Sequence, residues 1–179
     1  EETPQQLDRI LKDLKSQGMD SLILDLRNNP GGLLDKAVEV AERFLSKGTT
    51  IVSIKGRDDK QNVTYRSNFK APLIDIPIIL LINEGSASGS EIVAGAFQDL
   101  KRAILLGEKS FGKGSVQTVF PLKDGSALKL TTSRYFTPLG RSIHEKGIDP
   151  DIVVDEKEII VKTEEAKEKN LEKNNEKVE

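Results

Sequence analysis

The sequence contains no cysteine, no tryptophan and a single histidine, His144. The absence of cysteine excludes disulfide bonds and cysteine-based metal or redox sites. With one histidine, a Ser-His-Asp site would have to use His144, which lies in a segment rich in proline and glycine. We therefore expect a nucleophilic serine in this chain, if there is one, to use a different base.

The sequence also lacks a strong charge imbalance and a long apolar run. Its formal net charge is −2 with both signs interspersed, so neither nucleic acid nor an anionic membrane is implied as a partner. No run reaches the length of a membrane span, and no signal peptide stands at the Glu1 end. At 179 residues and 36% apolar content, the chain can bury one substantial core. Because it opens at Glu1 directly before a predicted helix, we expect a piece of a longer protein.

The most informative stretch runs from 77 to 117. An apolar run over 77–83 predicts a buried strand, the small residues of 84–90 predict a tight turn, and apolar residues at helical spacing follow. A serine at such a turn sits beside the positive end of a helix dipole, near backbone N–H groups that could receive an oxyanion. Ser86, Ser88 and Ser90 are therefore candidate nucleophiles.

Lysine is the other base that enzymes pair with serine. It must be largely neutral near pH 7, which requires lowering a lysine pKa by about three units from about 10.4, or about 4 kcal/mol. Desolvation in a closed pocket can do this. Lys113 lies between Gly112 and Gly114, ahead of a strand-like run over 116–120, and is a better candidate than lysines on helix faces or in the tail.

The remaining pattern predicts a layered α/β domain. Apolar stripes predict helices near 3–17 and 33–45, and strands are predicted over 21–26, 49–54 and 103–106, giving two β-α-β units. Alternating residues over 63–69 and the runs 116–122 and 127–136 predict additional hairpins. Each unit has a glycine-containing turn where its first strand ends, so both turns should lie at one edge of the sheet. Residues 1–155 form the predicted core, and the Glu- and Lys-rich segment 156–179 a solvated or frayed tail.

Three motifs in this sequence resemble, in order and spacing, the signatures of the C-terminal (tail-specific) processing serine proteases, a Ser/Lys family. They are DLRNNPGG at 25–32, GSASGSEI at 85–92 and FGKGSVQ at 111–117. The resemblance covers about residues 5 to 154. It implies a ClpP/crotonase-like β/β/α spiral fold and an endopeptidase that cleaves near the C-termini of proteins.

The resemblance also implies a role for individual residues. Ser88 is the nucleophile, Lys113 the general base, and Gln117 the residue that orients the lysine in some members. The oxyanion donors are the backbone N–H of Gly89 and that of a glycine in the Asn-Pro-Gly-Gly turn, Gly31 or Gly32. Many members have alanine where this chain has Gly89; since the donor is a backbone group, glycine should preserve the chemistry.

Several further expectations follow from the resemblance. No metal or organic cofactor is implied. The partners are protein substrates with exposed or unfolded C-termini. Family members usually carry a PDZ domain that captures these C-termini, and since this chain has no room for one, the resemblance implies a PDZ domain in the full-length protein. A homo-oligomer is left open. Family members usually work outside the cytoplasm, as periplasmic, membrane-associated or secreted proteins.

Other interpretations of the same residues are weaker. The segment 107–113 matches the start of a phosphate-binding P-loop, but Gly114 stands where the motif needs Ser or Thr. Ala87 breaks the G-x-S-x-G nucleophile elbow. Asp25, Arg27 and Asp99 are expected to be structural. Two alternatives stay open: a crotonase-type acyl-CoA enzyme, and a relative that binds ligands or peptides without catalysis.

Overall fold

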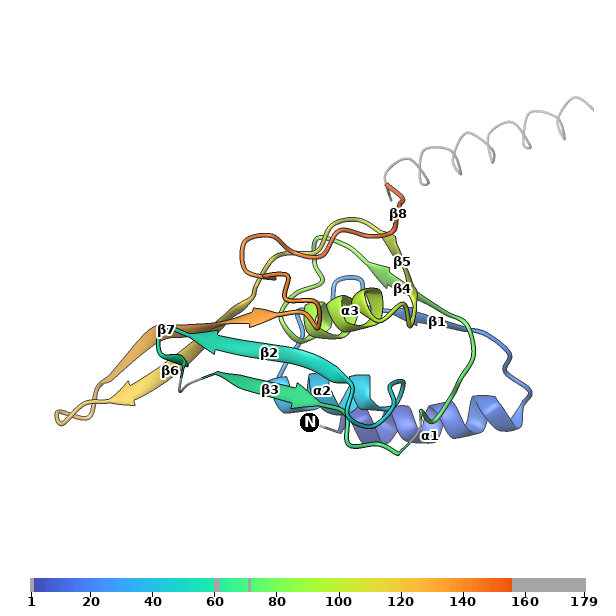
Figure 1. The fold of residues 1–179 in the computed structure, drawn as a ribbon, viewed down its shortest axis with the longest axis horizontal. Coiled ribbons are helices and arrows are strands. Elements are labelled where there is room, and N and C mark those ends of the chain that lie inside the picture. The colour runs from blue at the N-terminus through green and yellow to red at the C-terminus, as the bar shows by residue number, and fades with distance from the viewer. Residues whose placement is uncertain (1, 60–61, 71, 156–179) are drawn as a thin grey trace, which may run out of the picture.

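The computed structural model describes residues 2–59, 62–70 and 72–155, so the tail predicted over 156–179 lies outside the described residues. Two four-stranded sheets and three helices make up this part of the chain (Figure 1). The helices are α1 (Thr3–Ser16), α2 (Leu34–Glu42) and α3 (Gly89–Asp99). The strands are β1 (Leu22–Asp25), β2 (Thr50–Gly56), β3 (Val63–Arg66), β4 (Ile78–Ile82), β5 (Ile104–Gly107), β6 (Ser115–Pro121), β7 (Ala127–Phe136) and β8 (Ile152–Val153).

The first sheet is parallel and has the strand order β1-β4-β5-β8. Its central strand β4 comes from the continuous apolar run, and Ile78, Leu80 and Ile82 are buried. The connection from β4 through α3 to β5 confirms the second predicted β-α-β unit. Because parallel strands end at the same edge, the turns after β1 and β4 come together there.

The second sheet is antiparallel, with the order β3-β2-β7-β6. The first predicted β-α-β unit differs from the expectation, because β2 does not join β1. It pairs with β3 and β7 instead, and β1 takes β4 as its neighbour. The prediction of a layered α/β core with added hairpins is confirmed, and the two layers are the two sheets.

Helix α3 lies between these layers, which explains its composition (Figure 1). Every residue from Gly89 to Phe97 is buried, as expected for a helix whose residues, Glu91 apart, are apolar or small on all sides. Phe97 packs edge-on against Phe44, with ring centroids 5.3 Å apart. The core therefore surrounds the helix and fixes the position of its N-terminus.

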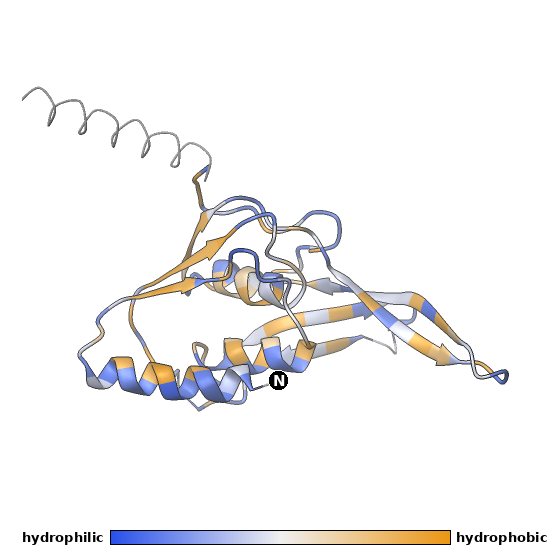
Figure 2. Cartoon of the chain, turned by 180° about the vertical axis from the view of Figure 1, so that it is seen from behind, coloured by the Kyte–Doolittle hydropathy of each residue, from blue (hydrophilic) through white to orange (hydrophobic). Residues whose placement is uncertain are grey.

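The hairpin of β6 and β7 extends away from this core (Figure 1). Apolar and polar residues alternate along it, and large apolar side chains such as Phe120, Leu128 and Leu130 are exposed (Figure 2). Among the described residues, no helix is both long and apolar enough to cross a membrane.

Candidate active site

The turns after β1 and β4 are bound to each other, as the sequence predicts. The backbone N–H of Asn28 donates to Asn83 Oδ1 over 2.8 Å, and Asn83 Nδ2 donates back to Asn28 Oδ1 over 3.1 Å. A Cβ atom on Gly85 would lie closer than 3.0 Å to Asn28, so glycine is required for this approach. The two turns therefore form one rigid unit at the edge of the parallel sheet.

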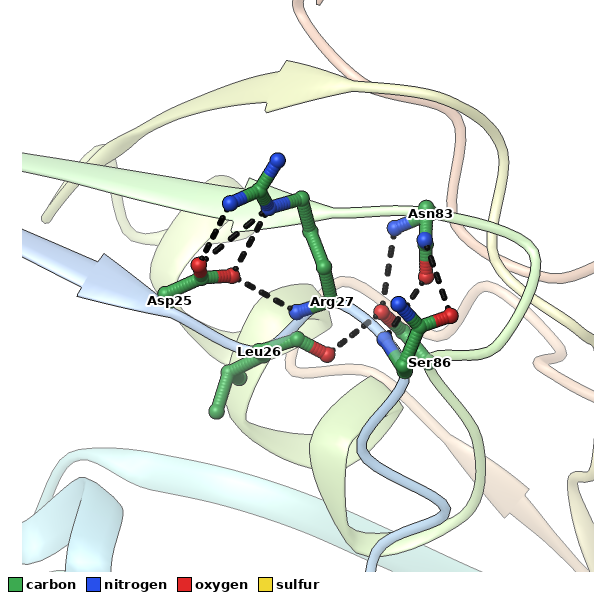
Figure 3. Close-up of polar contacts among 6 residues, drawn as sticks. Asp25, Leu26, Arg27, Asn83 and Ser86 are labelled. Atoms are coloured by element: carbon green, nitrogen blue, oxygen red, sulfur yellow. Dashed lines mark hydrogen bonds and ion pairs between the residues drawn. The ribbon is translucent and has the colours of Figure 1, made fainter. Parts of the chain in front are cut away.

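Two of the three candidate serines hold this unit together. Ser86 Oγ donates to the Leu26 carbonyl over 2.7 Å and accepts the Asn83 N–H over 3.0 Å (Figure 3). Ser90 Oγ donates to the Asn29 carbonyl over 3.0 Å. Both serines are buried. Their hydroxyl groups are structural, which leaves Ser88 as the candidate nucleophile.

Ser88 occupies the N-cap position of α3 and is half-buried. Its φ of 54° and ψ of −113° lie outside the regions that non-glycine residues favour. Within the described residues, its hydroxyl donates no hydrogen bond to a protein acceptor. A strained strand-to-helix turn of this kind is the backbone geometry of a nucleophile elbow, although Ala87 breaks the sequence motif. The G-x-S-x-G motif therefore does not reveal that the backbone at Ser88 adopts this elbow geometry.

The structure distinguishes between Gly31 and Gly32, the two candidate oxyanion donors in the turn after β1. The N–H of Gly31 already donates to Asn29 Oδ1 over 2.9 Å. The N–H groups of Gly32 and Gly89 have no acceptor among the described residues. A Cβ built on Gly89 would stand 3.2 Å from the Gly32 nitrogen, so these two groups belong to adjoining backbone segments. Gly32 and Gly89 are thus the pair available to an incoming oxygen.

Gly31 has a different function, which is to allow close packing. Its φ is +81°, and a Cβ there would lie closer than 3.0 Å to the Ala87 oxygen and the Gly89 nitrogen. Any side chain would push the first turn away from the turn that carries Ser88.

The loop that carries Lys113 is attached to the serine turn through its backbone. The N–H of Phe111 donates to the Ser86 carbonyl over 3.0 Å, and that of Lys113 donates to Glu91 Oε2 over 2.8 Å. The Lys113 side chain itself is exposed. The described residues therefore do not supply the desolvation that the sequence argument requires. Gln117 is also exposed, on β6 opposite Thr131, and makes no side-chain hydrogen bond among the described residues.

Glu91 is a residue that the sequence interpretation did not single out. It is fully buried, and its carboxylate accepts hydrogen bonds from four groups. Oε2 accepts the N–H of Ser88 and that of Lys113, each over 2.8 Å. Oε1 accepts the Ser110 hydroxyl and the Gly112 N–H, each over 2.6 Å. The signal was present as Ser88-x-x-Glu91, the capping-box spacing at the start of a helix.

His144 lies beside the lysine loop. A Cβ on Gly114 would lie closer than 3.0 Å to the His144 backbone, and the N–H of Glu145 donates to the Gly112 carbonyl over 2.9 Å. Among the described residues, His144 Nδ1 is buried without a hydrogen-bond partner, and Nε2 lies 3.8 Å from Glu145 Oε1. The carboxylate that would orient the histidine in a Ser-His-Asp site is therefore not on Nδ1.

The three charged residues that the sequence assigned to structure have structural contacts. Asp25 pairs with Arg27, with Asp25 Oδ2 and Arg27 Nη2 2.8 Å apart (Figure 3). The side-chain hydrogen bond from Arg27 lowers the pKa of Asp25, against a smaller opposing effect of burial. Asp99, at the end of α3, accepts from the Leu139 N–H over 2.8 Å and pairs with Arg141. These contacts are of the kind that the structural interpretation expects, although the Asp99 side chain is buried rather than on the solvent side.

An apolar cavity of about 440 Å³ opens beside the oxyanion glycines. Its wall includes the backbone of Gly31, Gly32 and Gly89, and side chains from α1, β1, α2 and α3. The apolar lining residues include Leu7, Leu24, Leu26, Leu33, Val40 and Val93. In the described part of the chain, no group of three or more His, Cys, Asp or Glu side chains is placed to hold a metal ion.

A strained serine at the N-terminus of a buried helix, beside backbone N–H groups, is the arrangement from which many serine hydrolases attack. The family follows from comparison with known proteins. A family model described as peptidase family S41 matches residues 1–154, and the chain belongs to that family.

The names of similar proteins agree with this membership. The chain is 53% identical over 164 residues to a carboxy-terminal-processing protease of Bartonella bacilliformis, covering 87% of this chain and 37% of that protein. It is 48% identical over 149 residues to a "Probable CtpA-like serine protease" of Staphylococcus aureus strain N315, covering 83% of this chain and 30% of that protein. The solved structure of a photosystem II D1 C-terminal processing protease superposes with a TM-score of 0.79 at 38% identity, covering 86% and 39% of the two chains. The chain thus spans between 30% and 39% of the length of these relatives.

Proposed function

We propose that this chain is the catalytic core of a serine endopeptidase that cleaves proteins near their C-termini, with Ser88 as nucleophile and Lys113 as general base. The observation that carries the proposal is the pairing at Glu91 Oε2. The backbone N–H groups of Ser88 and Lys113 each donate to this one oxygen over 2.8 Å. The two residues are therefore held side by side, although 24 positions in the sequence separate them.

The proposed reaction proceeds through an acyl-enzyme. Neutral Lys113 takes the hydroxyl proton of Ser88 as Oγ bonds to the scissile carbonyl carbon, and the N–H groups of Gly32 and Gly89 stabilise the oxyanion. When the C–N bond breaks, the lysine returns that proton to the leaving amine. Lys113 then activates a water molecule, which releases the new carboxylate and restores Ser88.

Lysine neutrality must come from something that covers the exposed Lys113 side chain. A bound substrate chain, or a part of the longer protein outside the described residues, could exclude water from it. Gln117, four residues after Lys113, keeps its proposed role as a group that orients the lysine in the covered state. The PDZ domain implied by the family, and work outside the cytoplasm, are further parts of this proposal.

The apolar cavity supports a preference at the cleavage site. The residue that supplies the scissile carbonyl must lie beside Gly32 and Gly89, next to which the cavity opens. Six of its fourteen lining residues are leucine or valine and one, Lys36, is charged, so an apolar side chain fits there and loses less hydration than a charged one. We expect cleavage after apolar residues.

The direct experiment is degradation of an unfolded polypeptide such as casein by the wild type, Ser88→Ala and Lys113→Ala. The proposal expects both variants to lose turnover while their unfolding midpoints remain close to that of the wild type. Full turnover in either variant would overturn it. The same assay tests the two alternatives. A crotonase-type enzyme or a binding protein would not cleave casein, so cleavage by the wild type that is lost in Ser88→Ala would exclude both.

A further inference from the structure

The buried carboxylate of Glu91 joins the two halves of the candidate site. Ser88 comes from the turn before α3, and Ser110, Gly112 and Lys113 come from the loop before β6. Glu91 is fully buried on the first turn of α3 and takes one hydrogen bond from the first half and three from the second.

The contacts of Glu91 are divided between its two carboxylate oxygens, and this division limits the distance between the backbones of Ser88 and Lys113. Because Ser88 and Lys113 donate to the same oxygen, their backbone nitrogens lie no farther apart than the sum of the two 2.8 Å bonds. Oε1 meanwhile holds Gly112 and Ser110, and the Ser110 hydroxyl accepts the Ile148 N–H over 2.7 Å. The carboxylate thus holds the lysine loop from two sides.

An ordinary helix cap needs fewer hydrogen bonds than Glu91 makes. A capping box satisfies one helix N–H with the N3 side chain, as the Ser88–Glu91 contact does here. The three bonds from the lysine loop add nothing to the helix terminus. Their effect is on where the backbone of residue 113 lies relative to residue 88.

We propose that Glu91 is a positioning residue that sets the separation between the nucleophile and the general base. This role rests on the proposed function for its catalytic consequence. Glu91 contacts neither substrate nor the reacting atoms, and acts through the backbone of Ser88 and Lys113. A misplacement of about 1 Å in such a pair costs about 100-fold in rate.

Glu91→Gln is the most direct test, since glutamine has nearly the same shape but places an NH₂ where an acceptor is needed. That NH₂ would face either the N–H groups of Ser88 and Lys113 or the Gly112 N–H and the Ser110 hydroxyl. We expect kcat on a peptide substrate to fall about 100-fold, while KM stays within about twofold. Glu42→Gln is the matched control: Glu42 is also a buried helical glutamate, and it accepts the Asn68 N–H over 2.9 Å away from the site. The control should keep the wild-type kcat.

Amide hydrogen exchange supplies a readout that does not depend on catalysis. In Glu91→Gln the N–H groups of Ser88, Gly112 and Lys113 should exchange at least about tenfold faster, while those of β4 keep their protection. If Glu91→Gln does not fold, Glu91→Asp retains the charge but is one methylene shorter. It should lose at least about tenfold in kcat and show the same local loss of protection.

Wild-type kcat together with wild-type protection at these three amides, in whichever variant folds, would overturn the positioning role. A loss of kcat equal to that of Glu42→Gln would overturn it as well. Retained turnover in Ser88→Ala would instead overturn the proposed protease function. In that case the exchange data alone would decide whether Glu91 holds the two segments together.

Discussion

The turn that carries Ser88 and the loop that carries Lys113 differ in what surrounds them. The serine turn lies at the edge of the parallel sheet, bonded to the turn after β1, and the residues around Ser88, namely Ser86, Ala87, Gly89 and Ser90, are all buried. The lysine loop leads into the projecting β6–β7 hairpin (Figure 1). The Lys113 side chain is exposed. The proposed nucleophile is therefore positioned by the core of this chain, whereas the proposed base is fixed only through its backbone.

This difference shows that the two halves of the candidate site need different surroundings. A strained serine and free N–H groups need rigid surroundings, which the core and the hydrogen bonds between the two turns provide. A neutral lysine needs dry surroundings, which the described residues alone do not provide. Substitutions in the two bonded turns around Ser88 should therefore affect stability and activity together, while equivalent substitutions at the tip of the β6–β7 hairpin should affect neither strongly.

The largest effect on stability should appear when Gly31 and Gly125, two glycines with similar backbone angles, are each replaced by alanine. Gly31 (φ +81°) lies against the serine turn, whereas Gly125 (φ +86°) in the hairpin turn has nothing within 4 Å of an added Cβ. Gly31→Ala adds a steric clash to the left-handed strain and should lower the unfolding free energy by about 2–4 kcal/mol. Gly125→Ala adds only the strain, about 1 kcal/mol. Urea unfolding of both variants checks this, and equal losses would remove the contrast between the regions.

A smaller effect is expected for a serine pair. Ser86→Ala leaves the Leu26 carbonyl and the Asn83 N–H without their buried partner, which costs about 1–3 kcal/mol and should lower turnover by loosening the turn. Ser126→Ala removes an exposed hydroxyl that donates to Asp124 over 2.7 Å, and its effect should stay within about 0.5 kcal/mol. Thermal unfolding and a degradation assay on both variants provide the measurement. A Ser86→Ala protein with wild-type stability would contradict the structural role of this hydroxyl.

The smallest effect concerns pH. Arg27 lowers the pKa of Asp25 in the folded state, so the pair stabilises the fold above the unfolded pKa, and this contribution is lost as pH falls through the folded pKa. Because the Asp25 side chain is 47% exposed, Asp25→Asn should cost no more than about 0.5 kcal/mol at neutral pH. The difference from the wild type should shrink as pH is lowered from about 7 to about 3. Urea unfolding over this range would contradict the account if the difference grew.

The local parts of this fold could be predicted, because each depends on neighbouring residues. The apolar run of β4, the small residues of the turn and the stripe of α3 lie next to one another in the sequence, and all three elements are present. The pairing of β2 with β7 could not be predicted, since it joins residues about 80 positions apart through contacts that no local pattern encodes.

The candidate site shows the same limit. The motifs pointed to Ser88 and Lys113, but not to the use of the Gly31 N–H by Asn29, which depends on how the turn closes. They also did not reveal that Glu91 reaches the lysine loop, because that loop begins about 20 residues later. The exposure of Lys113 is likewise a property of the packed chain.

The most direct test of the central claim is covalent labelling of the serine. A fluorophosphonate reagent should modify the wild type at Ser88, as located by mass spectrometry of the digested protein. Lys113→Ala and Lys113→Arg should each label at least about 100-fold more slowly, because alanine offers no base and arginine stays protonated at workable pH. Labelling of both lysine variants at the wild-type rate, or modification of the wild type at a serine other than Ser88, would contradict a site in which Ser88 and Lys113 act as one unit.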